Sequence, residues 1–533
     1  MSRSFEIHAR TLSVLTFASR ITGLARDAAL SRVFGVGVVT DAFSFAFMVP
    51  NLFRRLFGEG ALSSSFLPVY ARIEQSDPIA ARALARLVLW RLVVFLAAVT
   101  LVGEVILLLC WPPAGNPPAQ LSARLVFILL PYMPMVCCVA LMGAVLQVHH
   151  RFGPTAAAPI ILNLFIVGAC IGLSIPAMHF VGFNPVDSTL HITLVALSVI
   201  VAGLIQCLWS WRALRALNLR AGAITPAARD GFAQVVRQAA PMALGLGVLQ
   251  INTFVDGLIA SYPTLVGPTL FGFDYPLDEG SMGSLAFAQR LYEFPLGVFG
   301  ISVATAIFPQ LARQANNVPE FCALIARAMR LVVFIGLPAS AGLVMLRTPL
   351  TAAVFQGGDF TSEDTARVAT ILMAFAPAIW AYSANHVLTR AFYARGETMT
   401  PVRISVAMVA LNFLLNITLI WTPLGTSGLA LSTAFCAIVQ MFWMQRVLAK
   451  RIGPIITPTV RSSWLRSAIV TGLMIGALAL TMQFTPADRG WWGTVWTLGL
   501  LTAVGGAVVY AAAHLMKMPE LGWAMGRTEK STA

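Results

Sequence analysis

Long apolar segments follow one another along the whole chain, and this pattern constrains the fold more than any other feature. Of 533 residues, 58% are hydrophobic and only 11% are charged, whereas soluble domains are about 25% charged. Each segment is near the ~20 residues that an α-helix needs to cross ~30 Å of hydrocarbon. The sequence lacks the alternating pattern of a membrane β-barrel. It therefore predicts an all-α polytopic membrane protein with fourteen transmembrane helices. The segments are 11–33, 37–70, 84–111, 121–148, 157–178, 189–211, 238–262, 283–311, 328–347, 368–393, 404–421, 427–445, 467–484 and 491–515.

Basic residues are distributed unevenly between the loops. Because fourteen is even, both termini lie on one side of the membrane. If that side is the cytoplasm, 24 loop and terminal cations are cytoplasmic and five face the other side. Cytoplasmic loops carry the excess of Lys and Arg, so both termini are predicted to be cytoplasmic. The net charge of +14 then reflects orientation and attraction to anionic lipid, and no basic soluble domain remains to bind nucleic acid.

Two motif pairs indicate an internal repeat. FLPVYAR recurs as IFPQLAR, which places Pro68 on Pro309 at an offset of 241 residues, and Pro159 recurs as Pro401 at an offset of 242. Segments 1–6 and 7–12 are therefore predicted to be two copies of one unit. Six crossings return the chain to its starting side, so the copies are parallel repeats. Two such bundles around a central cavity are typical of alternating-access transporters, whereas the alternative is a duplication without transport.

The predicted domain organisation follows from this repeat. An N-lobe covers residues 1–217 and a C-lobe covers residues 218–451. Residues 452–533 hold two additional helices and a cytoplasmic tail. Several segments contain internal proline, such as Pro50 and Pro295, and we expect kinks or breaks there because irregular helices are tolerated where they line a cavity.

Seven arginines lie inside the apolar segments, where each charge costs at least ~2.5–3.5 kcal/mol. Arg91, and less clearly Arg390, fit side chains that extend from a helix end to the membrane surface. Arg20 and Arg26 have apolar sequence on both sides, and we expect Gly23 between them to loosen the helix so that both face a cavity. The seven are Arg20, Arg26, Arg54, Arg55, Arg91, Arg290 and Arg390.

Two of these arginines have an acidic neighbour on the same helix face. Arg55 and Glu59 are i,i+4 and Arg290 and Glu293 are i,i+3, which permits ion pairs and leaves Arg54 free. Ion pairs that only hold helices together are the alternative interpretation. The planar guanidinium binds phosphate in a bidentate manner, so a cluster of arginines favours an anionic, phosphate-bearing substrate.

Motifs of enzymes are missing from the sequence. It contains no GK dipeptide of a P-loop and no HExxH. The seven cysteines have no CxxC spacing and are interpreted as packing residues. A membrane glycosyltransferase would need paired acidic residues near a loop, which we do not find. The chain is therefore predicted not to be an enzyme.

Three stretches resemble one known family. SRITGLARDAALSRVFGVGVVTDAFSFAFMVPNLFRRLFGEGALSSSF, AQRLYEFPLGVFGISVATAIFPQLAR and FYARGETMTPV are similar to the MurJ (MviN) family of lipid II flippases in the multidrug/oligosaccharidyl-lipid/polysaccharide exporter superfamily. The resemblance implies a monomer in the bacterial inner membrane that works in peptidoglycan biosynthesis. It implies lipid II, an undecaprenyl-pyrophosphate-linked disaccharide-pentapeptide, as cargo. It also implies movement of this cargo to the periplasmic leaflet without a cofactor.

The resemblance also implies roles for individual residues. Glu59 and, with a weaker match, Arg390 correspond to gating positions, and Arg32 is interpreted as structural. The positions that match the family's substrate-binding residues are Ser19, Arg20, Arg26, Asp41, Arg54, Arg290 and Glu293.

A sodium site found in some family members is matched only in part. Asp256, Asn412 and Thr433 fit its pattern, but Asn416 stands where a second carboxylate is expected. Such a site should bind Na⁺ weakly. A gradient of Na⁺ or H⁺, the membrane potential and the substrate's own gradient remain the alternatives for the energy source, and we expect the potential to dominate.

Two other functions remain alternatives. A related polysaccharide-lipid flippase has similar needs, whereas a drug/cation antiporter should line its cavity with acids rather than arginines. A structural scaffold leaves the seven arginines unexplained. The isoprenoid tail that the resemblance implies does not fit a polar cavity, so the two additional helices, 467–484 and 491–515, are predicted to form a groove for it.

Overall fold

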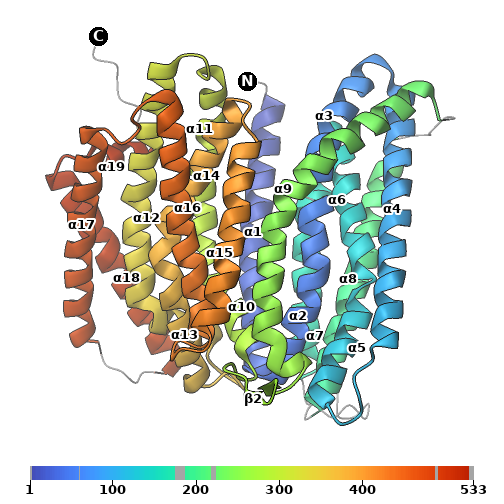
Figure 1. Ribbon diagram of the computed structural model, residues 1–533, viewed down its shortest axis with the longest axis horizontal. Helices are drawn as coiled ribbons and strands as arrows, with labels where there is room; N and C mark the ends of the chain where they lie inside the picture. The colour runs from blue at the N-terminus through green and yellow to red at the C-terminus, as the bar shows by residue number, and fades with distance from the viewer. Residues whose placement is uncertain (1–2, 59–60, 175–186, 218–223, 486–489, 527–533) are drawn as a thin grey trace. The chain divides into compact units, whose positions relative to one another are not determined.

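The computed structural model of the chain consists almost entirely of α-helices (Figure 1). It describes residues 3–58, 61–174, 187–217, 224–485 and 490–526. Within these ranges, ten helical stretches are long and apolar enough to cross a membrane. The predicted all-α polytopic membrane fold is therefore confirmed.

The chain forms two compact units, and the first comprises Met1–Gly283 together with Gly357–Phe360. After its last complete helix, α9, the chain forms a two-stranded antiparallel hairpin in which Thr269 pairs with Asp274 and Leu270 with Phe273. The elements are α1 (Arg3–Phe34), α2 (Val38–Phe53), the π-helical turn η1 (Arg54–Gly58), α3 (Ala61–Ser76), α4 (Pro78–Leu109), α5 (Pro117–Leu129), α6 (Tyr132–Val148), α7 (Gly153–Gly172), α8 (Ser188–Arg215), α9 (Pro226–Leu265), β1 (Thr269–Leu270) and β2 (Phe273–Asp274).

The second unit comprises Ser284–Gln356 and Thr361–Ala533. Helix α10 begins at Ser281, in the first unit, and continues into the second. The elements are α10 (Ser281–Pro295), the π-helical turn η3 (Leu296–Gly300), α11 (Ile301–Arg313), α12 (Val318–Phe355), α13 (Ser362–Phe375), the 3₁₀ turn η4 (Ala376–Ala378), α14 (Ile379–Ala394), α15 (Met399–Leu419), α16 (Thr426–Ile452), α17 (Pro458–Gln483), α18 (Gly490–Leu515) and α19 (Pro519–Ala524).

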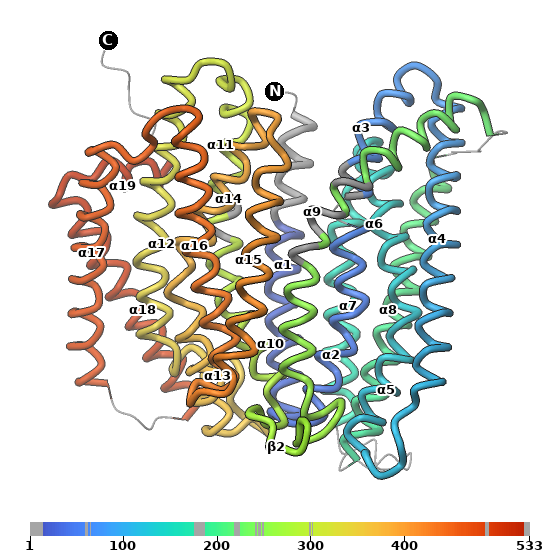
Figure 2. Tube along the Cα trace, in the orientation of Figure 1, coloured from blue at the N-terminus to red at the C-terminus, as the bar shows by residue number. Residues whose placement is uncertain are grey.

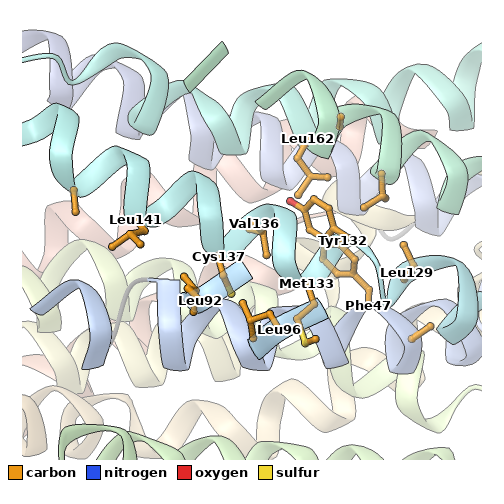
Figure 3. Packing of buried hydrophobic residues seen from close by; sticks show 14 of the residues in the cluster. Phe47, Leu92, Leu96, Leu129, Tyr132, Met133, Val136, Cys137, Leu141 and Leu162 are labelled. Atoms are coloured by element: carbon orange, nitrogen blue, oxygen red, sulfur yellow. The ribbon is translucent and has the colours of Figure 1, made fainter. Parts of the chain in front are cut away.

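The core of the first unit is a cluster of buried side chains from most of its helices (Figure 3). Phe47 of α2 stacks near Tyr132 of α6, with ring centroids 6.5 Å apart. Cys137 and Cys170 are fully buried in the same cluster, as predicted for cysteines that serve packing. This core fixes α2 and α6, and thereby the start of η1.

Helix α9 packs against α2, α3 and α4 of the first unit (Figure 1). The compact units therefore divide at residue 283, after α9, whereas the predicted lobes divide at residue 217. The first division follows packing and the second follows the sequence repeat, so the predicted lobe boundaries stay a prediction.

Two π-helical turns interrupt the helices that follow α1 and α9. Turn η1 covers residues 54–58 and η3 covers residues 296–300, so the second lies 242 residues after the first. A π-helical turn carries one extra residue and leaves the i→i−4 ladder incomplete. The break expected at Pro295 occurs directly after this residue, whereas Pro50 lies within continuous α2 and the break begins four residues later, at Arg54.

Two other predicted segments are each broken into two helices. Segment 121–148 is divided between α5 and α6 around Leu130 and Pro131, and segment 368–393 is divided between α13 and α14 by η4. Both breaks contain a proline, whose missing N–H removes one bond of the helix ladder. The sequence predicted one helix in each place.

The additional helices α17 and α18 lie side by side against α12 (Figure 2). The short helix α19 connects α12 to α17. Its Glu520 is 1% exposed and accepts hydrogen bonds from Arg330 of α12 and Ser463 of α17, both at 2.6 Å. The indole of Trp523 lies beneath Arg327 and Arg330, at 4.5 and 4.9 Å from the two guanidinium carbons. The predicted lipid groove on α17 and α18 stays a prediction.

Candidate functional site

Arg26 is buried in the first unit and forms an ion pair with its sequence neighbour. Its Nε and Nη2 atoms donate to the same oxygen of Asp27, at 2.9 and 2.7 Å. Its Nη1 donates to the side-chain oxygen of Asn163 on α7, at 3.2 Å. The ring of Phe47 lies 5.9 Å from the guanidinium carbon. The charge that the sequence placed in an apolar segment is thus neutralised by an adjacent carboxylate in this conformation.

Asn163 connects this ion pair to the preceding part of α1. Its side-chain nitrogen donates to the Thr22 hydroxyl at 3.2 Å and to the Ser19 carbonyl at 3.4 Å. Ser19 therefore takes part through its backbone. Arg20, the next residue, is half-buried. Sequence reasoning missed Asn163, although an amide within an apolar segment is itself a signal of a buried polar contact.

The expectation that Gly23 loosens the first helix is wrong. Helix α1 runs without interruption from Arg3 to Phe34. A Cβ atom at Gly23 would lie 3.5 Å from the side-chain nitrogen of Asn163, an ordinary van der Waals distance, so the packing of α7 against α1 does not require a glycine at this position. Arg20 and Arg26 therefore stay about 120° apart around one helix.

Asp41, at the start of α2, is fully buried and accepts three hydrogen bonds. One oxygen accepts from the Thr264 hydroxyl at 2.9 Å and from the backbone N–H of Gly280 at 2.6 Å, and the other accepts from the N–H of Gly283 at 2.7 Å. Gly280 and Gly283 flank the first turn of α10. A carboxylate there satisfies free N–H groups and interacts favourably with the helix dipole. Asp41 thus binds the start of α10 and the end of α9 to α2.

Arg54 is the first residue of the π-helical turn η1. It is half-buried, and its Nε donates to the side-chain oxygen of Asn51 at 3.0 Å. The expectation that Arg54 is free is therefore wrong, because a residue three positions earlier on α2 engages it. Glu59 lies outside the described residues. Its predicted pair with Arg55 and its predicted gating role therefore stay predictions.

Arg290 and Glu293 form the ion pair that their spacing predicted, with 3.2 Å between the nitrogen and oxygen atoms. Their side chains are 36% and 37% exposed, so both remain accessible to a ligand. Both lie on α10, within the two turns that precede η3. Arg390 on α14 is half-buried, and its guanidinium carbon lies 5.9 Å from the ring of Phe308.

Three of the four residues matched to the sodium site gather in the second unit. The Asn412 side-chain nitrogen donates to Ser432 and Thr433, each at 3.2 Å, and its oxygen accepts from Asn416 at 2.9 Å. The Asn416 oxygen accepts from Ser432. Each amide oxygen thus accepts an internal hydrogen bond. Ser432 was missed, because a hydroxyl in a helix usually bonds its own backbone.

Asp256 belongs to α9 in the first unit. It is 6% exposed, and one carboxylate oxygen accepts from the Asn252 side chain at 3.2 Å. The two asparagines near Thr433 carry no charge, so the carboxylate of Asp256 is the only charge among the four matched positions. Its sodium role stays a prediction.

Comparison with known proteins identifies the family. A family model described as "Lipid II flippase MurJ" matches residues 30–497, which include Asp41, Arg54, Arg290 and the asparagine network. The chain belongs to the MurJ family. This is a family of transporters rather than enzymes, as the sequence predicted.

Individual MurJ relatives match over most of the chain. A probable lipid II flippase MurJ of Vibrio cholerae serotype O1 is 30% identical over 95% of this chain and 94% of its own length. A probable lipid II flippase MurJ of Rhizobium meliloti is 31% identical over 79% of this chain and 76% of its own.

Solved structures support the fold. A lipid II flippase MurJ in an inward closed conformation matches with a TM-score of 0.74 and 22% identity, over 95% of this chain and 98% of the other. An inward-facing MATE-family multidrug transporter of the MOP superfamily matches with a TM-score of 0.60 and 15% identity, over 81% and 95%. The MurJ family thus shares its fold with other exporters, as the resemblance implied.

Proposed function

We propose that this chain is a lipid II flippase, which moves the lipid-linked peptidoglycan precursor from the cytoplasmic to the periplasmic leaflet by alternating access. The observation that carries the proposal is the MurJ family match over residues 30–497. The arginines inside the membrane segments support it independently, since a pyrophosphate is the part of such a lipid that guanidinium groups bind.

The proposed architecture has fourteen crossings in two parallel six-helix repeats, followed by α17 and α18. Among the described residues, ten helical stretches are long and apolar enough to be crossings. The other four are α1, α2–α3, α9 and α10–α11, which carry the charges that function needs. The π-helical turns support the repeat, because their offset of 242 residues equals that of Pro159 and Pro401.

The proposed orientation in the bacterial inner membrane has both termini in the cytoplasm. The distribution of 24 cations against five supports it. Reporter fusions after Lys517 and within 212–237 are expected to be cytoplasmic, and fusions within 263–280 periplasmic. A periplasmic C-terminus contradicts the count of crossings.

The substrate-binding role is proposed for the arginines that remain accessible. Arg20, Arg54 and Arg290 are half-buried, which leaves part of each guanidinium open to a ligand. Arg26 is proposed to act together with Asp27 and Asn163, whose contacts hold its fork in place. A cation/drug antiporter, suggested by the MATE-like fold, is disfavoured because acids rather than arginines should then dominate.

Depletion of this protein in its host tests the function. Lipid II should then accumulate in the cytoplasmic leaflet, and a leaflet-specific assay of lipid II measures this. The wild-type chain should restore export, whereas Arg20→Ala should fail at normal protein level and Arg20→Lys should restore it only in part. Arg91→Ala is the matched control, since Arg91 is exposed on α4, and it should restore export fully. Normal lipid II export with a defect in another polysaccharide carrier favours the related exporter instead.

We propose that the membrane potential, rather than Na⁺, supplies most of the energy. The asparagine network supports this, because the side-chain oxygens of Asn412 and Asn416 already accept hydrogen bonds and Asn416 brings no charge. The potential acts on moving charge with ~2.3 kcal/mol per elementary charge per 100 mV.

Flipping should therefore stop when the potential is dissipated at constant Na⁺ and should continue in sodium-free medium. The leaflet assay in cells with a clamped potential measures both. Asn416→Asp, which restores the second carboxylate, should increase the Na⁺ dependence. A strict Na⁺ requirement of the wild-type chain that Asp256→Asn removes contradicts the proposal.

A further inference from the structure

The hairpin between α9 and α10 presents two phenylalanines to its surroundings. Phe271 is 94% exposed and Phe273 is 71% exposed. Phe271 and Gly272 form the two-residue turn, with φ values of 51° and 86°. Both values are positive, as in a type I′ turn, where Asn, Asp or Gly is the usual first residue. A bulky apolar residue therefore occupies a position that suits it neither in backbone conformation nor in exposure to water.

The base of this hairpin is firmly built. The rings of Tyr262 and Tyr275 stack with centroids 4.3 Å apart. The Tyr275 N–H donates to the Pro268 carbonyl at 2.7 Å, and the Asn116 side chain donates to the Val266 carbonyl at 3.1 Å. The exposed rings are thus presented by an ordered support rather than by a loose loop.

The hairpin folds back along the last turns of α9. The Tyr275 hydroxyl donates to the carbonyl of Ile259 at 2.9 Å, and the Tyr262 hydroxyl donates to the carbonyl of Thr269 at 3.0 Å. Ile259 lies six residues before the end of α9, which is about 9 Å along the helix axis. The predicted membrane segment 238–262 ends at this level. Figure 1 shows β2 beside this end of α9.

We propose that Phe271 and Phe273 insert into the lipid interface on the periplasmic side and hold the ends of α9 and α10 at a fixed depth. Val266, directly after the end of α9, is 58% exposed and adds another exposed apolar side chain close to the hairpin in sequence. This inference rests on the membrane location and the proposed orientation of the chain, and not on the transport of lipid II.

The charges of the loop indicate which part of the lipid it contacts, namely the apolar region rather than the headgroups. Residues 263–283 contain no Lys, Arg or His, so the loop has no side chain that would attract anionic headgroups. The exposed acids Asp274, Asp278 and Glu279 lie on the same loop and stay in water. Insertion should therefore depend on the aromatic rings, and anionic lipid should not strengthen it.

Site-directed spin labelling of the full-length chain in liposomes tests the proposal. In a Cys110→Ser background, which removes the exposed cysteine, labels are placed by Phe271→Cys and, as matched control, by Asp278→Cys on the same loop. The label at 271 should be at least threefold more accessible to oxygen than to a water-soluble nickel chelate, and the label at 278 should show the reverse.

One further variant and one change of lipid extend this test. Adding Phe273→Ser should shift the label at 271 toward the aqueous pattern, and changing from neutral to anionic lipid should not increase the accessibility of this label to oxygen. An aqueous pattern at 271 in the purified chain overturns the proposal, and is the result expected if the hairpin binds a periplasmic protein instead. Export of lipid II in the same samples is measured separately, so its loss does not decide the outcome.

Discussion

Asp41→Ala should abolish lipid II export and should also lower the thermal stability of the protein. The substitution leaves three buried donors without an acceptor, namely the Thr264 hydroxyl and the N–H groups of Gly280 and Gly283. Each unsatisfied buried group costs about 1–3 kcal/mol, so the free energy of unfolding should fall by roughly 2–5 kcal/mol after partial relaxation. Melting temperature in detergent and complementation of a depleted strain measure the two effects.

The matched control is Thr264→Val, which removes one of the three donors and leaves both backbone bonds intact. It should reduce the melting temperature only slightly and preserve complementation. The pair of results also separates two roles of Asp41. If Asp41 only contacts substrate, as the family resemblance implied, Asp41→Ala should lose export while its melting temperature stays normal.

Contacts between residues close in sequence were predictable. The ion pair of Arg290 with Glu293 follows from i,i+3 spacing on a helix, and the structure contains it. The apolar segments gave the positions of the membrane helices because lipid requires the backbone to bond within each segment. The resemblance matched Asn412, Asn416 and Thr433 to one sodium site, and hydrogen bonds connect these three residues in the structure. Their role in binding sodium stays a prediction.

Contacts between distant segments were not predictable. Asn163 lies 137 residues after Arg26, and Asp41 lies 239 residues before Gly280, so neither pair shares a local periodicity. The π-helical turn η1 contacts α6, and it changes the register on which the expected geometry of Arg54 relied. Sequence periodicity cannot report such a change, because it assumes 3.6 residues per turn throughout.

Arg26→Ala should also abolish export, but its interpretation depends on Asp27. Removing the arginine leaves a carboxylate that is 10% exposed without its ion-pair partner, and breaking a buried pair from one side costs about 3–5 kcal/mol. The single variant should therefore be both unstable and inactive. Loss of activity in this variant alone does not reveal whether Arg26 binds substrate.

The double variant Arg26→Ala/Asp27→Ala separates the two explanations. It removes both charges, so its melting temperature should return to near that of the wild type, since replacing a whole buried pair is often close to neutral. If Arg26 binds the pyrophosphate, the stable double variant should still fail to export lipid II, whereas Asp27→Ala alone should retain part of the activity because the arginine remains. If the double variant restores export, Arg26 serves only to neutralise Asp27, and the pyrophosphate must be bound by arginines such as Arg20, Arg54 and Arg290 that remain half-exposed in this conformation.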